Sequence, residues 1–387
     1  HQLRSLALMP HRRHNIYYDF AYHCIIHHWR CCRRTDHLNR RLSKGMRILV
    51  IGDQHFRYEH SYANSIKDGR KEEWGNVKKT IHKTAESCDA VVLIGDNFNA
   101  RHNHSSVIRE FVDFLNGFGE KEIHLLVGNH ERYGTSTALD FLKNIKHKNW
   151  FVYSEPITET IGDQLVMMVP FMTPSLLGVE TKEEGEKEIF NRMSKADLCF
   201  AHHAISGAKS TEFFAGEIVL DKNKMENLYG ITFFGHLHAP EKISSKIQGT
   251  GNIFTQEVGE PGKSIWVWDT TTKKIGEVPL PVRGIYKVVW ENPEWHTPKE
   301  KDALSQIPSD SIVKCYVTSR ETDLDVVRKV LGRFDASILI EQYPNERTKV
   351  HFDDGGLDLS VESMLKRYSE AKGLSYTDLQ SGFELIK

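Results

Sequence analysis

Short apolar runs recur along the first two thirds of the chain, and amphipathic stretches separate the first three of them. The runs are Arg47–Ile51, Ala90–Ile94, Ile123–Val127, Leu198–Ala201 and Ile231–Phe234. Runs of this length bounded by polar or turn residues are typical of buried strands. Apolar residues at helical spacing over Trp74–Ser87 and Ser105–Phe118 predict helices between the first three strands. This alternation of strands and helices indicates an α/β fold.

The pattern becomes rich in strands after His203. The runs at Ile253-Phe254, Ile265–Trp268 and Ile285–Val289 each predict a strand. A sandwich of two sheets, with helices on both outer faces, accommodates both halves of residues 46–290. We therefore expect one catalytic domain over this range, with an α/β/β/α sandwich fold.

The remaining C-terminal residues predict a small second domain and a terminal helix. The acidic, proline-containing stretch 291–308 is typical of a linker. A strand over 311–318, a helix over 322–334 and a strand over 336–342 predict an α+β capping domain at 309–350. In the segment 356–387, a helix over 360–372 carries Met364, Leu365 and Tyr368 on one face. That face could pack on the protein's own core or on the coiled coil of a partner.

Charge is distributed unevenly, although the formal net charge is only −1. Residues 1–45 hold nine basic and two acidic residues, whereas the rest holds 42 basic and 50 acidic residues. The first 45 residues show no helical or alternating period, so we expect a non-core N-terminal extension, either disordered or artefactual, before a natural start at Met46. Its His and Cys residues resemble a zinc cluster and its arginines a transit peptide, but the spacing is irregular.

Cysteine use and hydropathy bear on the compartment. Beyond the extension only Cys88, Cys199 and Cys315 occur, widely spaced and without a Cys-x-x-Cys motif. This pattern favours a reducing compartment, so we expect a cytoplasmic protein in a bacterial or phage-infected cell. No run approaches the ~18 apolar residues that a membrane helix needs.

Five short polar blocks carry the candidate chemistry, and each lies at the end of an apolar run. They are Asp53-Gln54-His55, Gly95-Asp96, Gly128-Asn129-His130-Glu131, His202-His203 and Gly235-His236-Leu237-His238. If such residues only capped strands, carboxylates and imidazoles would be buried without partners, which is costly. Oxygen and imidazole donors without thiolates suit a pair of Mn, Fe, Mg or Zn ions better than a structural zinc site.

The order and spacing of these blocks resemble the calcineurin-like metallophosphoesterase superfamily, and within it the SbcD-type nucleases that work with SMC-like ATPases. The resemblance runs from Met46 to about Asp269. The second block reads Gly-Asp-Asn-Phe-Asn, close to the nuclease pattern Gly-Asp-x-Phe, and lacks the Asp-Arg-Gly of protein serine/threonine phosphatases. Val169-Pro170-Phe171 and the stretch 251–260 also resemble SbcD-like chains. Asn99 departs from the Asp or His that is common there, so the preferred DNA strand is left open.

The resemblance implies two divalent ions, Mn²⁺ in the first place, with Mg²⁺, Fe²⁺ and Zn²⁺ as alternatives. Two such ions can supply a nucleophile and neutralise the phosphate. By this likeness Asp96 bridges the ions, and the other ligands divide between them: Asp53, His55 and His238 for the first ion, and Asn129, His202 and His236 for the second. His203 is the alternative to His202, because strand ends inferred from sequence are uncertain by a few residues.

His130 remains as the residue that is not a ligand. Directly after Asn129, its ring could hydrogen-bond the phosphate or protonate the leaving oxygen, or it could only fix the loop. We expect Glu131 to orient it.

Taken with the resemblance, these observations favour a nuclease. It would cleave DNA phosphodiester bonds, as exonuclease and endonuclease, in an SbcCD-like complex for DNA repair, recombination or replication. The implied partners are DNA, an SMC-like ATPase of SbcC type and a second copy in a homodimer, with no membrane. The alternative enzyme is a phosphatase or phosphodiesterase acting on a small molecule or a protein. A mere scaffold for an ATPase is disfavoured, because none of the five blocks is broken.

Overall fold

The computed structural model describes residues 45–57, 59–60, 63, 66, 69–145, 147–209, 216–290, 307–317, 323–333 and 335–342. The predicted N-terminal extension up to residue 44, the linker residues 291–306 and the terminal helix over 360–372 lie outside the described residues. The chain divides into two compact units. The first comprises the residues up to Tyr286 together with Asp310–Ile312. The second comprises Lys287–Ser309 and the residues from Val313 onward.

The first sheet of the first unit contains six strands in the order β14-β13-β1-β2-β3-β6. Their bounds are β1 (Arg47–Ile51), β2 (Ala90–Leu93), β3 (Glu122–Leu126), β6 (Trp150–Tyr153), β13 (Ser264–Asp269) and β14 (Lys274–Pro279). Strands β1, β2, β3 and β6 are parallel neighbours, and β13 pairs antiparallel with β1. The carboxyl ends of β1, β2 and β3 therefore lie at one edge of this sheet.

The second sheet has the order β11-β12-β10-β9-β8-β7. Its strands are β7 (Ile157–Ile161), β8 (Gln164–Val169), β9 (Ala196–Ala201), β10 (Tyr229–Phe234), β11 (Glu241–Lys242) and β12 (Ile247–Gly249). Strands β8, β9 and β10 are parallel, with Val169, Ala201 and Phe234 in one row across the sheet. The last residues of these three strands thus share an edge, as in the first sheet.

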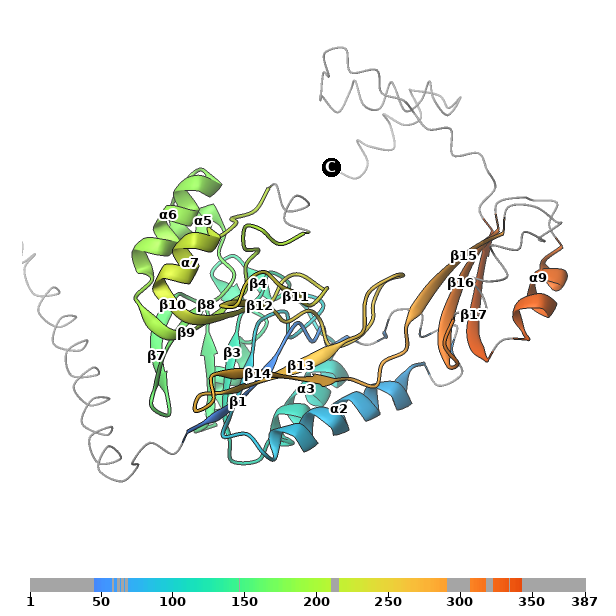
Figure 1. Ribbon diagram of the computed structural model, residues 1–387, viewed down its shortest axis with the longest axis horizontal. Coiled ribbons are helices and arrows are strands. Elements are labelled where there is room, and N and C mark those ends of the chain that lie inside the picture. The colour runs from blue at the N-terminus through green and yellow to red at the C-terminus, as the bar shows by residue number, and fades with distance from the viewer. Residues whose placement is uncertain are drawn as a thin grey trace, which may run out of the picture. The chain divides into compact units, whose positions relative to one another are not determined.

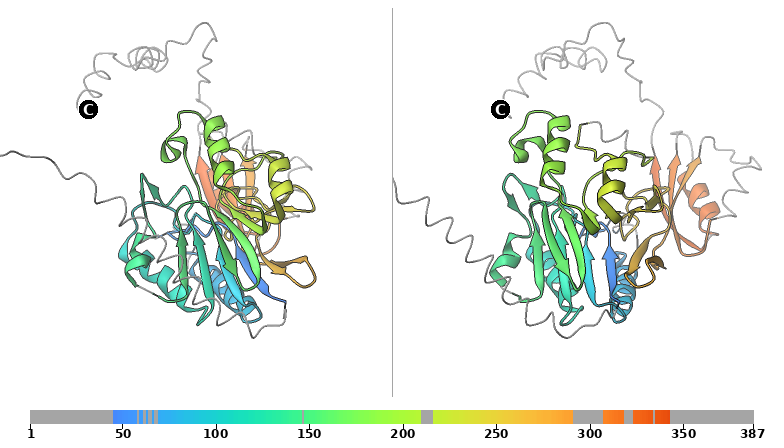
Figure 2. Two further views of the ribbon diagram at one scale, coloured as in Figure 1. Left: turned by 90° about the vertical axis from the view of Figure 1, so that its left-hand side faces the viewer. Right: turned by 60° about the vertical axis from the view of Figure 1, so that its left-hand side comes forward.

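Three apolar layers hold the unit together. The middle layer lies between the sheets and joins alternate residues of β1, such as Ile48 and Val50, to Leu198 and Phe200 of β9. The outer layers pack helices on the other face of each sheet (Figure 1). One outer face carries α2 (Lys71–Ala85), α3 (Ser105–Asn116) and α4 (Asp140–Ile145), and the other carries α5 (Pro174–Leu177), α6 (Lys182–Arg192) and α7 (Lys222–Leu228). Figure 2 shows this layering from two further directions. The predicted α/β/β/α sandwich is confirmed.

Local sequence explains where the helices form. On α2, Trp74, Val77 and Ile81 recur at helical spacing and are buried against the first sheet. Helix α6 begins at a capping box, in which the Thr181 side chain accepts from the Glu184 N–H and the Glu184 carboxylate accepts from the Thr181 N–H. Such caps satisfy amide groups that the first helical turn leaves unpaired.

One predicted strand is wrong. Ile253 and Phe254 are buried, but they belong to no strand. The Ile253 N–H donates to the Asp53 carbonyl at 3.1 Å, so this backbone serves a loop beside the first polar block. A run of two apolar residues indicates that they are buried. It does not indicate whether their backbone pairs with a neighbouring strand.

The second unit contains most of a three-stranded sheet in the order β15-β16-β17. These strands are β15 (Ile285–Trp290), β16 (Ser311–Val317) and β17 (Ala336–Gln342), with α9 (Leu324–Leu331) between the last two. Val327 and Leu331 of α9 pack on Trp290 and Cys315 of the sheet. The predicted order of strand, helix and strand after residue 311 is confirmed.

Two short strands, β4 (Arg132–Tyr133) and β5 (Ser136–Thr137), form a separate hairpin after the third polar block.

Among the residues that the structure describes, no helix has both the length and the apolar character to span a membrane.

Candidate metal centre

The polar blocks directly follow strands whose carboxyl ends lie at one edge of each sheet. The side chains concerned are Asp53 and His55 after β1, Asp96 after β2, Asn129 after β3, His202 after β9, and His236 and His238 after β10. Because the two sheets stack face to face, these loops converge from both layers, and the structure brings all seven predicted ligands together.

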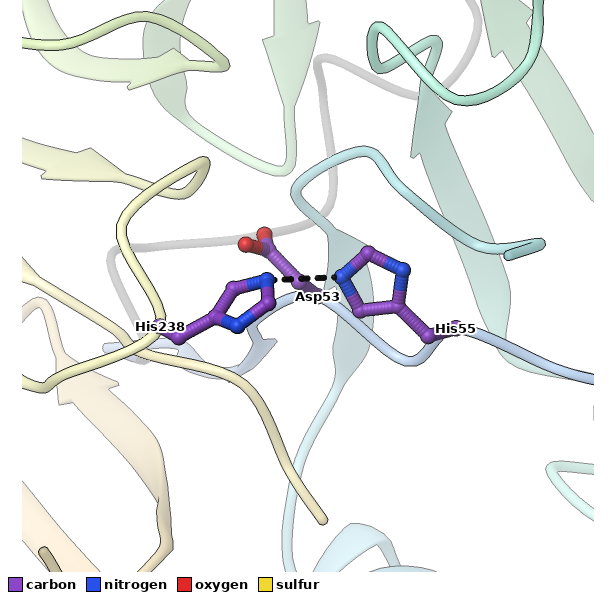
Figure 3. A group of neighbouring side chains, drawn as sticks. All are labelled: Asp53, His55 and His238. Atoms are coloured by element: carbon purple, nitrogen blue, oxygen red, sulfur yellow. Dashed lines mark hydrogen bonds between the residues drawn. The ribbon is translucent and has the colours of Figure 1, made fainter. Parts of the chain in front are cut away.

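The first cluster consists of Asp53, His55 and His238, whose donor atoms all lie within 4.8 Å of one another. Figure 3 shows the rings of His55 and His238 turned toward each other, with the Asp53 carboxylate beside them. Their Nε2 atoms are 3.1 Å apart. Two imidazole nitrogens bound to one ion at about 2.0–2.1 Å would be separated by about 2.9–3.4 Å, so the spacing fits a shared cation.

The second cluster consists of Asp96, Asn129, His202 and His236. The carboxamide oxygen of Asn129 lies 3.1 Å from His202 Nε2 and 3.0 Å from His236 Nδ1. The same position is 3.1 Å from Asp96 Oδ2. With its oxygen inward, Asn129 completes a set of four donor groups around one position, which suits a bound cation. The oxygen and nitrogen donor set suits Mn, Fe or Zn.

Asp96 lies between the two clusters. Its Oδ1 is 3.4 Å from His202 Nε2 in the second cluster, and its Oδ2 is 3.9 Å from His55 Nε2 in the first. The carboxylate thus lies within reach of both clusters, where two ions could share it. The His130 N–H also donates to Asp96 Oδ1 at 3.0 Å, which fixes the orientation of the carboxylate.

The charges of these buried groups favour a cation. Burial raises the pKa of Asp53 to about 6, with the neighbouring Asp96 carboxylate adding to the shift. Although burial alone would lower it, the Asp96 and Asp53 carboxylates raise the pKa of His202 to about 10. An imidazole that holds an extra proton so firmly lies where negative charge is concentrated. The same field attracts a divalent ion.

The backbone at the centre adopts unusual conformations. The φ angles of His55, Asp96 and His236 are 48°, 44° and 78°, in the left-handed region that residues other than glycine rarely occupy. Such conformations cluster at functional sites, where packing enforces them. A Cβ atom at Gly128 would lie 2.1 Å from Asp96 Oδ1, so the block needs glycine to let the two ligand loops meet.

His130 lies at the centre with part of its ring accessible. Its Nδ1 lies 2.8 Å from the Asn99 carbonyl oxygen, to which it donates when protonated, and its Nε2 is 3.9 Å from Asp96 Oδ2. The ring also contacts the edge of the His55 ring at 4.8 Å between centroids. The side chain is 38% exposed, so Nε2 can meet a substrate.

The expected role of Glu131 is wrong. Its two carboxylate oxygens accept from the backbone N–H groups of Phe98 at 2.6 Å and of Gly128 at 2.7 Å. Both oxygens are therefore committed to joining the second and third loops, and the Asn99 carbonyl orients His130 instead. Burial, together with Asp96, raises the pKa of Glu131 to about 8.

The structure places His202, and not His203, in the cluster. His203 Nε2 accepts from the Met172 N–H at 3.0 Å, its Nδ1 faces the Ile218 carbonyl at 3.3 Å, and its ring stacks on Phe171. Both of its nitrogens are thus engaged away from the ligands. His202 Nδ1 donates to the Ile94 carbonyl at 2.6 Å, which leaves Nε2 for the centre.

Sequence reasoning missed two carboxylates behind the histidines of the fifth block. Glu217 Oε2 lies 2.7 Å from His236 Nε2, and Glu260 Oε1 lies 3.4 Å from His238 Nδ1. Glu260 belongs to the stretch 251–260 that carried the family likeness, so a signal for it existed. Glu217 lies in a segment without strand or helix pattern, and nothing local marked it.

A match to a protein family agrees with this geometry. The family model "calcineurin-like phosphoesterase" matches residues 46–240, half of the chain. A solved structure of an archaeal phosphodiesterase is 17% identical, with a TM-score of 0.32, and the match covers 61% of this chain and all of that one. A search of curated proteins found no match. The family match, on a chain whose predicted ligands converge, shows that the protein belongs to the calcineurin-like phosphoesterases and is a metal-dependent phosphoesterase.

Proposed function

We propose that this phosphoesterase is a nuclease that hydrolyses DNA phosphodiester bonds with two divalent ions, Mn²⁺ in the first place. The choice of a diester rests on the cationic side chains next to the ligand blocks. Those of Arg132, Lys263 and Arg57 are each already engaged by an acceptor within the protein. Arg132 donates to the carbonyls of Phe171 and Ser154. Lys263 is buried and lies 2.8 Å from Glu260. Arg57 donates to Gln256.

Charge balance explains why this matters. Two divalent ions would bring four positive charges, of which the carboxylates of Asp53 and Asp96 would neutralise two. A diester phosphate and a hydroxide nucleophile together would balance the other two. A monoester adds a further negative charge, which calls for a cationic side chain directed at the substrate. The Gly95-Asp96 block, which lacks the Asp-Arg-Gly of protein phosphatases, supports the same choice.

When bound, the ions supply Lewis acidity and a nucleophile at neutral pH. The chain contributes ligand positions and a proton. Asp53, whose carboxylate accepts from the His236 N–H at 2.9 Å, holds the first cluster beside the second. His130, fixed through Nδ1 by the Asn99 carbonyl, presents Nε2 to the substrate side. It can protonate the 3′ or 5′ oxygen as the P–O bond breaks, because an alkoxide is a poor leaving group.

The test is an assay of the full chain with Mn²⁺ and with Mg²⁺. The substrates are end-labelled duplex, hairpin and single-stranded DNA, with bis-p-nitrophenyl and p-nitrophenyl phosphate for comparison. We expect cleavage of DNA and of the diester, with kcat/KM on the diester at least tenfold above the monoester. Asp96→Asn, prepared in parallel, should cleave none of them and so excludes a contaminating nuclease. Preference for the monoester, with DNA left intact, would assign the protein to the phosphatases.

We further propose an SMC-like ATPase of SbcC type as partner and a homodimer as the working state. Residues beyond 45 carry 42 basic against 50 acidic side chains, so they provide little net attraction for DNA, whose binding depends on phosphate neutralisation. A basic partner would supply that attraction. Co-purification with a candidate ATPase and light scattering of the isolated chain test the two claims. A monomer that gains no DNA binding from the ATPase would contradict both.

A further inference from the structure

We propose that Glu217 and Glu260 are positioning residues, each of which holds one histidine of the Gly235–His238 block and thereby sets the affinity for one of the two ions. His236 and His238 are separated by a single residue, yet they belong to different clusters. Each has a glutamate on the side away from its cluster. The inference rests on the metal centre of the proposed function but does not depend on DNA as the substrate.

The first pair is Glu217 with His236. His236 Nδ1 faces the second cluster, 3.0 Å from Asn129 Oδ1, and its Nε2 lies 2.7 Å from Glu217 Oε2. A carboxylate beside one ring nitrogen favours the tautomer with the proton there, so the lone pair of the other nitrogen is available to an ion. The chain just after Glu217 is anchored, since Ile218 is buried and the Leu220 N–H donates to the Ala204 carbonyl at 2.9 Å.

The second pair is Glu260 with His238. His238 faces the first cluster through Nε2 and has Glu260 at Nδ1, at 3.4 Å. Glu260 is itself fixed, because its Oε2 accepts from the Gln256 N–H at 3.0 Å and lies 2.8 Å from Lys263 Nζ. Lys263 also donates to the His238 carbonyl at 3.1 Å. The histidine, the glutamate and the lysine thus form a closed network.

The two histidines present opposite nitrogens to their clusters. His236 turns Nδ1 inward and His238 turns Nε2 inward, so each needs its proton on a different atom. A neutral imidazole in water exchanges between the two forms, and a carboxylate at the outer nitrogen favours the form whose inner nitrogen is free to bind an ion. Because each histidine has its own carboxylate, loss of one glutamate should weaken one ion and leave the other unchanged. Groups of this kind contribute about 10–100-fold in metal affinity.

The experiment measures Mn²⁺ binding to the metal-free full chain, by calorimetry and by the EPR signal of free Mn²⁺, without substrate. The wild type should bind two ions. Glu217→Ala and Glu260→Ala should each weaken one site about 10–100-fold and leave the other within about threefold. The Gln variants keep an acceptor oxygen and should recover most of the affinity. Glu183→Ala, on an exposed position of α6, is the matched control and should bind as the wild type does.

A double-mutant cycle assigns each glutamate to its ion. In a His236→Ala background, Glu217→Ala should weaken binding no further, whereas Glu260→Ala should still weaken the remaining site. Additive losses for Glu217→Ala and His236→Ala, equal weakening of both sites, or wild-type affinity in the single variants would each overturn the proposal. A protein that binds ions as expected but leaves DNA intact would contradict the nuclease function alone.

Discussion

Replacement of His130 by alanine should slow cleavage of DNA without releasing the metal ions. Two features of the structure separate this residue from the ligands, although one of its ring nitrogens lies within 4.8 Å of donor atoms of His55 and Asp96. Its side chain is 38% exposed, and its contact with the Asp96 carboxylate at 3.0 Å is made by the backbone N–H, which alanine retains. The change therefore removes a proton donor and preserves the position of Asp96.

The expected loss of rate follows from the role of His130 as a proton donor. Protonation of a leaving oxygen by a placed side chain contributes about 10²–10⁴-fold in rate, or about 2.7–5.5 kcal/mol of activation free energy. This loss applies only where the leaving group needs a proton. A deoxyribose alkoxide does, whereas a nitrophenolate leaves as the anion. His130→Ala should thus lower kcat on DNA by about 10²–10⁴-fold and on bis-p-nitrophenyl phosphate by less than about tenfold.

The assay compares the two substrates at saturating Mn²⁺, with metal content determined on the same preparations. Asp96→Asn serves as the contrasting variant, because loss of the bridging charge should reduce both activities and the metal content together. Equal losses of His130→Ala on both substrates would refute general acid catalysis. Loss of metal from His130→Ala would show that His130 is a ligand.

Three further predictions concern stability, backbone and pH. Glu73→Ala leaves the fully buried Arg70 guanidinium without the carboxylate that contacts it at 2.8 Å, so unfolding free energy should fall by about 3–5 kcal/mol, measured by denaturant titration; a change below about 1 kcal/mol would contradict this. Gly128→Ala forces a Cβ atom to within 2.1 Å of Asp96 Oδ1 and should cost the chain at least one ion in metal analysis; an unchanged metal content would contradict the need for glycine here. The pKa of His202 near 10 means that an ion must displace its proton at neutral pH, so Mn²⁺ affinity should rise from pH 6 to pH 9, and calorimetry in buffers of different ionisation enthalpy should detect proton release.

The sandwich was predictable because its strands are locally encoded. Arg47–Ile51 coincides with β1 of the sandwich, and in the second unit 336–342 coincides with β17, since both runs are bounded by polar or turn residues. The strand predicted at Ile253-Phe254 is wrong because burial and strand pairing are different properties. Its residues are buried in the apolar layer that includes α2, and the Ile253 N–H donates to the Asp53 carbonyl of a loop and not to a neighbouring strand.

The choice between His202 and His203 also had a signal in the sequence. Side chains of a strand alternate between its faces, and Leu198 and Phe200 of β9 point into the layer between the sheets. His202 continues that alternation and reaches the centre between the two sheets. Cys199 and Ala201 face the helices, and His203 follows them. The period of two, extended one step beyond the strand, selects the residue that the structure places in the cluster.

The partners of the histidines could not be predicted in this way. A ligand at a strand end is positioned by the register of its own sheet, which neighbouring sequence determines. Glu217 reaches His236 from the segment between β9 and α7, and Glu260 reaches His238 from 22 residues further along the chain. Their positions depend on how loops of both sheets pack together, which no local pattern records. It follows that substitutions in these loops can change the affinity for each ion while every ligand block remains intact, so complete blocks alone do not guarantee an active centre.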